Sequence, residues 1–278
     1  MGMKDLLVHV NVSKHCRSRL EIGVLLAKAF DAHLTGLFTS EARDVPFFMM
    51  EEIASKIEPT MRGWWLQARD KVKAEFEALL RNTGVAADWI EVEENVATMV
   101  PYHARYADLV IVGQTDPDEL LPRPEYEIPE AAALDSGRPV LVIPYAGTFG
   151  SVGQRVLVAW NGSAQSARAV HDAFPFLRRA EKVTVLTINP EQLRKNQGDR
   201  PGAQIAAHLS RHGMKAAIRE ITVDRVDIDD MILSQASDEA ADLIVMGAYG
   251  HPRAREIILG GATRGLFKHM TAPVLMSH

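Results

Sequence analysis

An internal repeat constrains the fold of this chain more than any other feature of its sequence. The segment LLVHVNVS, residues 6–13, matches VLVAWNGS, residues 156–163, at an offset of 150. Further along, YADLVIVG at 106–113 matches AADLIVMG at 240–247 at an offset of 134, and a PVL tripeptide follows each copy at the same interval. The halves are therefore predicted to share one fold, with about sixteen extra residues near 44–65 of the first half.

Each half alternates short β-branched runs with amphipathic segments, a pattern typical of βαβ units and a parallel sheet. We expect two doubly wound domains, at residues 1–147 and 152–278, joined by a Gly-, Ser- and Pro-containing segment at 144–154 that suits an exposed hinge. In the first half we predict strands near 5–10, 34–39, 88–93, 108–112 and 139–143, and helices near 18–31, 62–82, 97–106 and 128–136. In the second half we predict strands near 155–160, 183–188, 217–222, 242–246 and 273–276, and helices near 164–178, 201–212, 228–240 and 261–269.

Composition places the chain among ordinary globular proteins, with 47% hydrophobic and 24% charged residues in 278. It has no apolar run long enough for a membrane span, its N-terminus lacks the pattern of a signal peptide, and its one cysteine cannot form an intrachain disulfide. We therefore expect a cytoplasmic protein without a metal site. Residues 1–150 hold 15 Lys and Arg against 23 Asp and Glu, and the remainder hold 16 against 13. The second half should tolerate polyphosphates better, but its charge is too small to indicate nucleic acid.

A glycine motif follows the predicted fourth strand of the second half. Ligands of doubly wound sheets bind beyond the carboxyl ends of the strands, where the winding reverses. Gly247, Gly250 and Gly260 are separated by two and then nine residues, and Gly261 and Thr263 begin a predicted helix. Glycines allow close backbone approach, and free N–H groups at a helix start can hold a phosphate. The motif is neither a P-loop nor a dinucleotide fingerprint.

This motif, with its position and the closing APVL strand, resembles the ATP-binding members of the universal stress protein family. The resemblance covers both halves and implies a tandem of two five-stranded, Rossmann-like domains of the adenine nucleotide alpha hydrolase type. It implies ATP or AMP in the second domain, with Mg²⁺ as a possible companion. Two positions depart from the family pattern. Gly261 stands where the family has Ser or Thr, and Asn161 replaces an acidic residue at the end of the first strand.

The resemblance assigns Met246, Gly247 and Gly250 to the ribose side, and Gly260, Gly261 and Ala262 to backbone contacts with phosphates. Thr263 would add a hydroxyl. The loop after the first strand and the end of the second strand complete the candidate nucleotide-binding set: Asn161, Gly162, Ser163 and Ile188. His251 and Arg253 either steer anions into the site or are merely solvated, and Asn161 to Ser163 either bind ligand or form a turn with Ser163 as the helix N-cap.

The first half provides an internal control. The offset of 134 places Asp116, Tyr126 and Glu127 at the positions of Gly250, Gly260 and Gly261. Two carboxylates would then lie where phosphates should be, so we expect no ATP binding in the family manner there. No residue is predicted to be catalytic, and slow ATP hydrolysis is the most that the motif supports.

The leading hypothesis is thus a nucleotide-binding, stress-response regulatory protein that acts on unidentified protein partners. We also expect the halves to pack as a pseudo-dimer through their final strands, with a homodimer of the whole chain left open. The alternative is an interaction module without nucleotide that uses the apolar segment 46–65. That segment includes Trp64 and Trp65, for which core packing is the simpler interpretation.

Overall fold

The computed structural model describes residues 2–39, 51–116, 118, 128–191, 201–224, 227–248 and 261–278, of which 51–62, 201, 261, 262 and 264 are described by their backbone alone. None of the helices in these ranges is long and apolar enough to cross a bilayer. The described strands are β1 (Asp5–Val10), β2 (His33–Thr39), β3 (Ala87–Val92), β4 (Leu109–Gly113), β5 (Val140–Ile143), β6 (Arg155–Ala159), β7 (Lys182–Ile188), β8 (Ala217–Ile221), β9 (Leu243–Gly247) and β10 (Val274–Ser277). The described helices are α1 (Cys16–Phe30), α2 (Glu51–Leu80), α3 (Val96–Ala104), α4 (Ile128–Asp135), α5 (Ala164–Asp172), α6 (Phe174–Leu177), α8 (Pro201–Arg211), α9 (Ile228–Asp238) and α10 (Gly261–His269).

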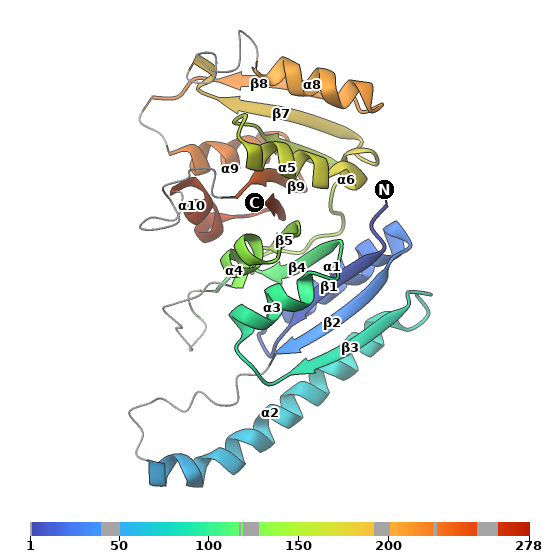
Figure 1. Cartoon of the computed structure of the whole chain (residues 1–278), viewed down its shortest axis with the longest axis vertical. Coiled ribbons are helices and arrows are strands. Elements are labelled where there is room, and N and C mark those ends of the chain that lie inside the picture. The colour runs from blue at the N-terminus through green and yellow to red at the C-terminus, as the bar shows by residue number, and fades with distance from the viewer. Residues whose placement is uncertain are drawn as a thin grey trace.

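Within the described residues, these strands form one sheet of ten in the order β3-β2-β1-β4-β5-β10-β9-β6-β7-β8. Pairing is parallel inside each half, and the two halves have the same strand order (Figure 1). The prediction of two similar parallel, doubly wound halves is confirmed. The two sheets are continuous rather than separate, because the last strand of each half pairs with that of the other.

The halves meet through their final strands, as predicted, and these strands, β5 and β10, pair antiparallel. Leu141 lies opposite Leu275, and Val142 lies opposite Val274. Since Leu141 and Leu275 are equivalent residues of the repeat, a local twofold axis passes between them. Both strands are fully buried, so the repeat joins its own copies through an apolar edge that would otherwise be an exposed strand.

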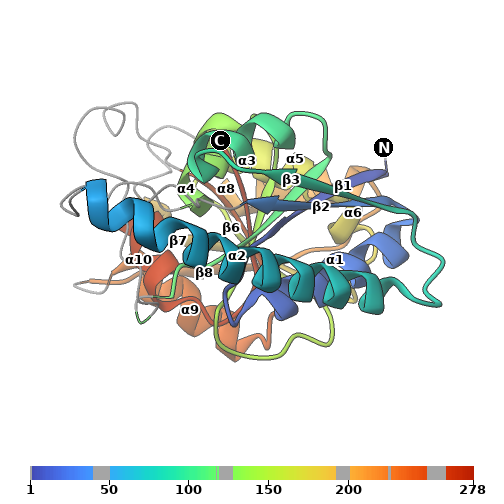
Figure 2. The same cartoon turned by 90° about the horizontal axis from the view of Figure 1, so that it is seen from below.

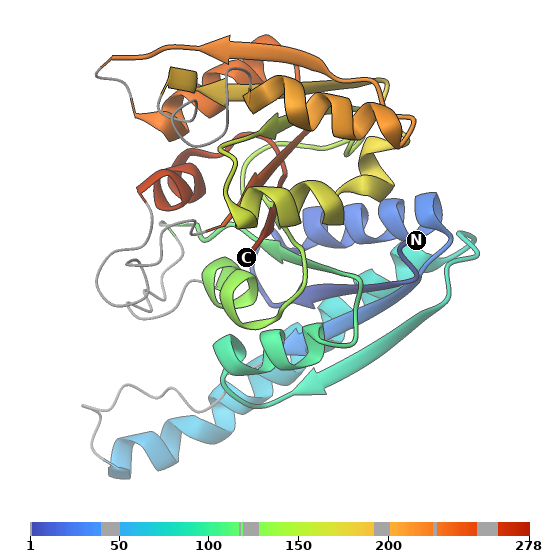
Figure 3. The same cartoon turned by 45° about the horizontal axis from the view of Figure 1, so that its top comes forward.

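Helices cover both faces of the sheet. One hydrophobic core lies between the sheet and α1, α2, α5, α6 and α8, and a second lies under α3, α4, α9 and α10. Figure 2 shows α1 and α2 on one side of the first-half strands and α3 and α4 on the other. In Figure 3, α6 lies beside the C-terminal end of α1, where the rings of Phe30 and Phe176 meet edge to face at 5.1 Å. The halves therefore pack through helices as well as strands.

The segment between the halves was predicted to be a hinge, and its later part is instead fixed by one carboxylate. Asp242 accepts hydrogen bonds from Ser151 Oγ at 2.6 Å and from the backbone N–H groups of Gly153, Gln154 and Arg155 at 2.8–3.1 Å. Asp108, its equivalent in the repeat, accepts bonds from the start of β1 in the same way. A free hinge is therefore the wrong interpretation for residues 151–155.

Helix α2 differs most from its prediction, because it begins at Glu51 rather than near residue 62. Its C-terminal part packs on the core through Val72 and Phe76. Trp64 is 67% exposed and Leu66 is 39% exposed, so core packing is wrong for Trp64. The extra residues of the first half thus lengthen a helix that projects past the edge of the sheet (Figure 1).

Candidate functional site

The second-half site is built where β6 and β9 end side by side. Ala159, the last residue of β6, pairs with Met246, and β9 ends one residue later at Gly247. The order β9-β6-β7 means that the winding reverses between β6 and β9, the place where doubly wound sheets bind ligands. Ile188, half-buried at the end of β7, lies on the same edge.

The turn after β6 is held by its own side chains. Asn161 Oδ1 accepts hydrogen bonds from the Ser163 backbone N–H at 3.1 Å and from Ser163 Oγ at 2.7 Å. Ser163 Oγ in turn accepts from the Ser166 N–H at 3.1 Å and caps α5. Gly162 has a φ of 69°, which favours glycine. The turn interpretation of Asn161 to Ser163 is therefore confirmed, and a ligand role for them stays a prediction.

Gly247 is pressed against the first turn of α5. A Cβ at Gly247 would lie 2.5 Å from the backbone nitrogen of Ser166 and 2.6 Å from the carbonyl carbon of Gln165. Only glycine fits here, because the obstacle is backbone and cannot rotate away. The first glycine of the motif therefore brings the end of β9 against the start of α5, and Met246 and Ala248 beside it are buried.

Replacing Gly247 tests this contact. We expect Gly247→Ala to lower the free energy of unfolding by about 2 kcal/mol or more, since overpacking a rigid contact costs about 1–3 kcal/mol. Urea unfolding followed by circular dichroism would measure it. Gly63→Ala is the control, because Gly63 lies inside α2 and a Cβ there would have no atom within 4 Å, so this variant should gain about 0.5–1 kcal/mol. An unchanged stability of Gly247→Ala would contradict the close approach.

Of the remaining predicted residues, the described ones lie at the start of α10. Gly261 and Ala262 form its first turn, and Thr263 is buried. Gly250, His251, Arg253 and Gly260 lie outside the described residues. The structure therefore brings together Asn161, Gly162, Ser163, Ile188, Met246 and Gly247 at one edge. The ligand contacts of Gly250, His251, Arg253 and Gly260 stay predictions.

The equivalent place in the first half is occupied by charged side chains. Arg19 is 4% exposed, and it donates to the His9 carbonyl oxygen at 3.2 Å and to Asn11 Oδ1. Its guanidinium lies against Gly113, the equivalent of Gly247, and a Cβ at that position would clash with it. In the second half, the residue equivalent to Arg19 is the small Ala169.

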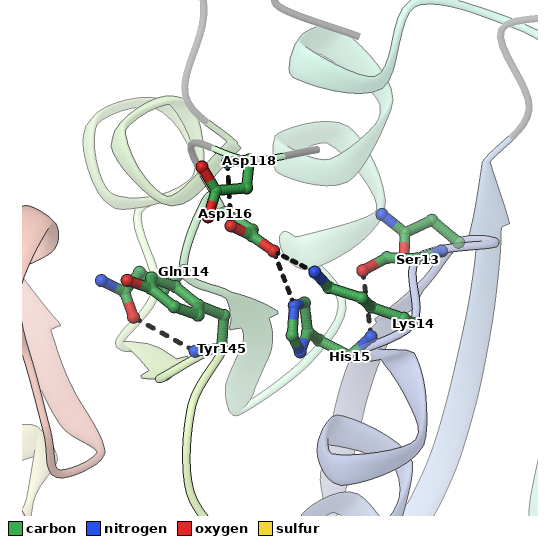
Figure 4. Close-up of polar contacts among 8 residues, drawn as sticks. Ser13, Lys14, His15, Gln114, Asp116, Asp118 and Tyr145 are labelled. Atoms are coloured by element: carbon green, nitrogen blue, oxygen red, sulfur yellow. Dashed lines mark hydrogen bonds and ion pairs between the residues drawn. The ribbon is translucent and has the colours of Figure 1, made fainter. Parts of the chain in front are cut away.

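Asp116, which follows β4, is itself paired. Its Oδ2 contacts Lys14 Nζ at 2.9 Å and His15 Nε2 at 2.8 Å, and its Oδ1 accepts from the Asp118 N–H at 3.0 Å (Figure 4). Hydrogen bonds from Lys14, then His15, then the Asp118 backbone hold the pKa of Asp116 well below its usual range. Asp116 is therefore a paired carboxylate rather than an isolated negative charge.

Figure 4 shows Lys14 and His15 reaching from the loop after β1 to Asp116 after β4, so the cluster joins the two loops that flank the first-half switch point. The ring of His15 also lies 5.7 Å from that of Tyr145. Tyr126 and Glu127, the other predicted obstacles, lie outside the described residues. Sequence reasoning named Asp116 but missed its partners Lys14 and His15, and it missed Arg19 against Gly113. A comparison of the two halves could have found them, because these three basic residues stand where the second half has Ala164, Gln165 and Ala169, respectively.

Residues 153–278 match the family model described as the universal stress protein family. The second half belongs to the universal stress protein family. The match starts at the linker and covers every strand of that half. A universal stress protein of Synechocystis sp. is 28% identical over 125 residues, which are 44% of this chain and 41% of that relative. The chain thus spans less than half the length of this curated relative.

Solved structures extend the likeness to the whole chain as a fold. A universal stress protein from Archaeoglobus fulgidus DSM 4304 matches with a TM-score of 0.69 at 16% identity, covering 98% of this chain and 97% of that one. A putative universal stress protein from Pseudomonas aeruginosa UCBPP-PA14 matches with a TM-score of 0.61 at 15% identity, covering 99% and 93%. The chain therefore has the fold of a tandem universal stress protein, with both halves in one sheet.

Proposed function

We propose that the second half binds an adenine nucleotide, ATP or AMP, and that the chain acts as a nucleotide-dependent regulatory protein of the stress response. One observation carries the proposal: the ends of β6 and β9 meet at a switch point where Gly247 fits closely against α5. The start of α10 supplies backbone N–H groups after the glycine motif, as a phosphate site requires.

The contrast between the halves supports the same assignment. In the first half the buried guanidinium of Arg19 lies against Gly113, whereas in the second half the equivalent of Arg19 is the small Ala169, and Gly247 lies against Gln165 and Ser166 at the start of α5. The first half therefore has a long cationic side chain at its switch point where the second half has an alanine. We therefore assign one nucleotide to each chain, with any Mg²⁺ bound through its phosphates, and we assign no catalytic residue.

The direct test is to denature the purified, tag-free protein and identify any nucleotide it releases, then to titrate ATP into the emptied protein by calorimetry. We expect one site per chain. Less than a tenth of an equivalent released, together with no binding of ATP or AMP at millimolar concentration, would contradict the proposal.

A second candidate function is supported by the exposure of Trp64 and Leu66 on α2. Large apolar side chains held at the surface are enriched at protein interfaces. An interaction module would use α2 whether or not nucleotide is bound. If no nucleotide binds, and if Trp64→Ser abolishes the capture of a partner that wild type retains, this candidate replaces the first.

A further inference from the structure

Two exposed histidines form a pair at the C-terminal end of α8, far along the chain from the glycine motif. His208 lies in the last turn of the helix, and His212 follows four residues later, after the helix ends at Arg211. Their ring centroids are 4.8 Å apart. No hydrogen bond found among the described residues involves a ring nitrogen of either histidine.

This separation fits two ligands of one metal ion. Imidazole nitrogens bind transition metals at about 2.1 Å, which places each ring centroid roughly 3.2 Å from the ion. With one nitrogen of each ring directed at the same ion, two centroids 4.8 Å apart correspond to a ligand–metal–ligand angle of about 100°. That angle lies between the tetrahedral and octahedral values, so the separation of the two rings is compatible with one shared ion.

An aromatic ring lies beside the pair. The ring of Phe174, the first residue of α6, lies 4.9 Å from His212 and 6.1 Å from His208. A cation at the C-terminal end of a helix is also favoured by the carbonyl groups there. Arg178 packs over Phe174 and Arg211 lies on the same turn, and these charges oppose a metal ion, so moderate affinity is expected.

We infer that His208 and His212 form a two-histidine site for a divalent transition metal ion such as Ni²⁺ or Zn²⁺, with water as the other ligands. Among the residues that the structure describes, no three His, Cys, Asp or Glu side chains are grouped to hold a metal ion, so the protein supplies only two ligands. Neutral imidazole selects such metals over Mg²⁺. Binding would clamp the end of α8 and raise the melting temperature.

Calorimetric titration of tag-free protein with NiCl₂ at pH 7.5 tests the site. We expect one ion per chain for wild type, and at least a tenfold loss of affinity in each of His208→Asn and His212→Asn. His171→Asn is the matched control, because His171 contacts the same Phe174 ring at 5.2 Å and should leave the affinity within about twofold.

Three results would overturn the inference. These are the absence of binding at 1 mM Ni²⁺, an unchanged affinity when both histidines are replaced, or an equal loss in His171→Asn. The substituted positions are exposed, so circular dichroism should show folded variants. The site and the nucleotide proposal can fail separately, because MgCl₂ with ATP reports on one and NiCl₂ alone on the other.

Discussion

Between pH 6.5 and pH 4, the protein should lose stability steeply, and His9→Gln should remove most of that loss. His9 is buried on β1, and its Nε2 lies 2.8 Å from Thr39 Oγ1. Burial, and secondarily the nearby charge of Arg19, lowers the pKa of His9 to about 3. The folded protein therefore keeps this imidazole neutral over the whole range.

The sign of the effect follows from the two states. In the unfolded chain the histidine has a pKa of about 6.5, so below that pH the unfolded state binds a proton that the folded state does not bind. The stability that depends on neutral His9 is fully present above pH 6.5 and is lost as the pH decreases toward about 3. The slope approaches 1.4 kcal/mol per pH unit, which amounts to roughly 3 kcal/mol by pH 4. That is a large part of the 5–15 kcal/mol typical of a folded protein.

Urea unfolding at half-unit steps of pH would measure the effect. Gln keeps a hydrogen-bonding group near Thr39 but does not titrate, so the curve of the variant should be flatter over this interval. His269→Gln, at an exposed position on α10, is the control and should follow wild type. Parallel curves for wild type and His9→Gln would show that His9 does not govern the acid sensitivity.

The fold could be predicted from sequence because the repeat supplied the same evidence twice. Strand positions were right to within one or two residues, and the contact between β5 and β10 was expected from the resemblance to the universal stress protein family together with two apolar terminal strands. The start of α2 was wrong, because the segment before residue 62 exists only in the first half and has no second copy to compare. The role of Asp242 was also missed, since a carboxylate that fixes a linker looks like any other charge in sequence.

The candidate site could be predicted only in part, for a similar reason. The glycine spacing marked Gly247 as a position of close backbone approach, and the structure shows that approach toward α5, while the predicted contact with a ribose stays a prediction. Arg19 was missed because it lies on α1, remote in sequence from Gly113, and only the fold shows that its guanidinium lies against that glycine. The His208 and His212 pair has helical spacing that was visible in sequence, but its meaning depends on the orientation of two rings.

The loop substitution with the largest expected effect on binding copies the first half into the second. Gly260→Tyr with Gly261→Glu should weaken ATP binding by about a hundredfold, or about 2.7 kcal/mol. Gly261 begins α10, where a phosphate would meet the backbone N–H groups, and a carboxylate there repels it at close range. Calorimetric titration of ATP would measure the loss, with Gly63→Ala as a variant distant in sequence that should bind as wild type does.

The reverse exchange should fail for a reason that the structure supplies. Asp116→Gly with Tyr126→Gly and Glu127→Gly restores the glycines of the first half but leaves Arg19 against Gly113. Adding Arg19→Ala, which copies Ala169, removes the side chain that lies against Gly113. Of these substitutions, it is the one most able to allow a second nucleotide to bind. We expect no second site in the triple variant. A second equivalent of ATP bound by the triple variant would show that the loop, and not Arg19, closes the first half.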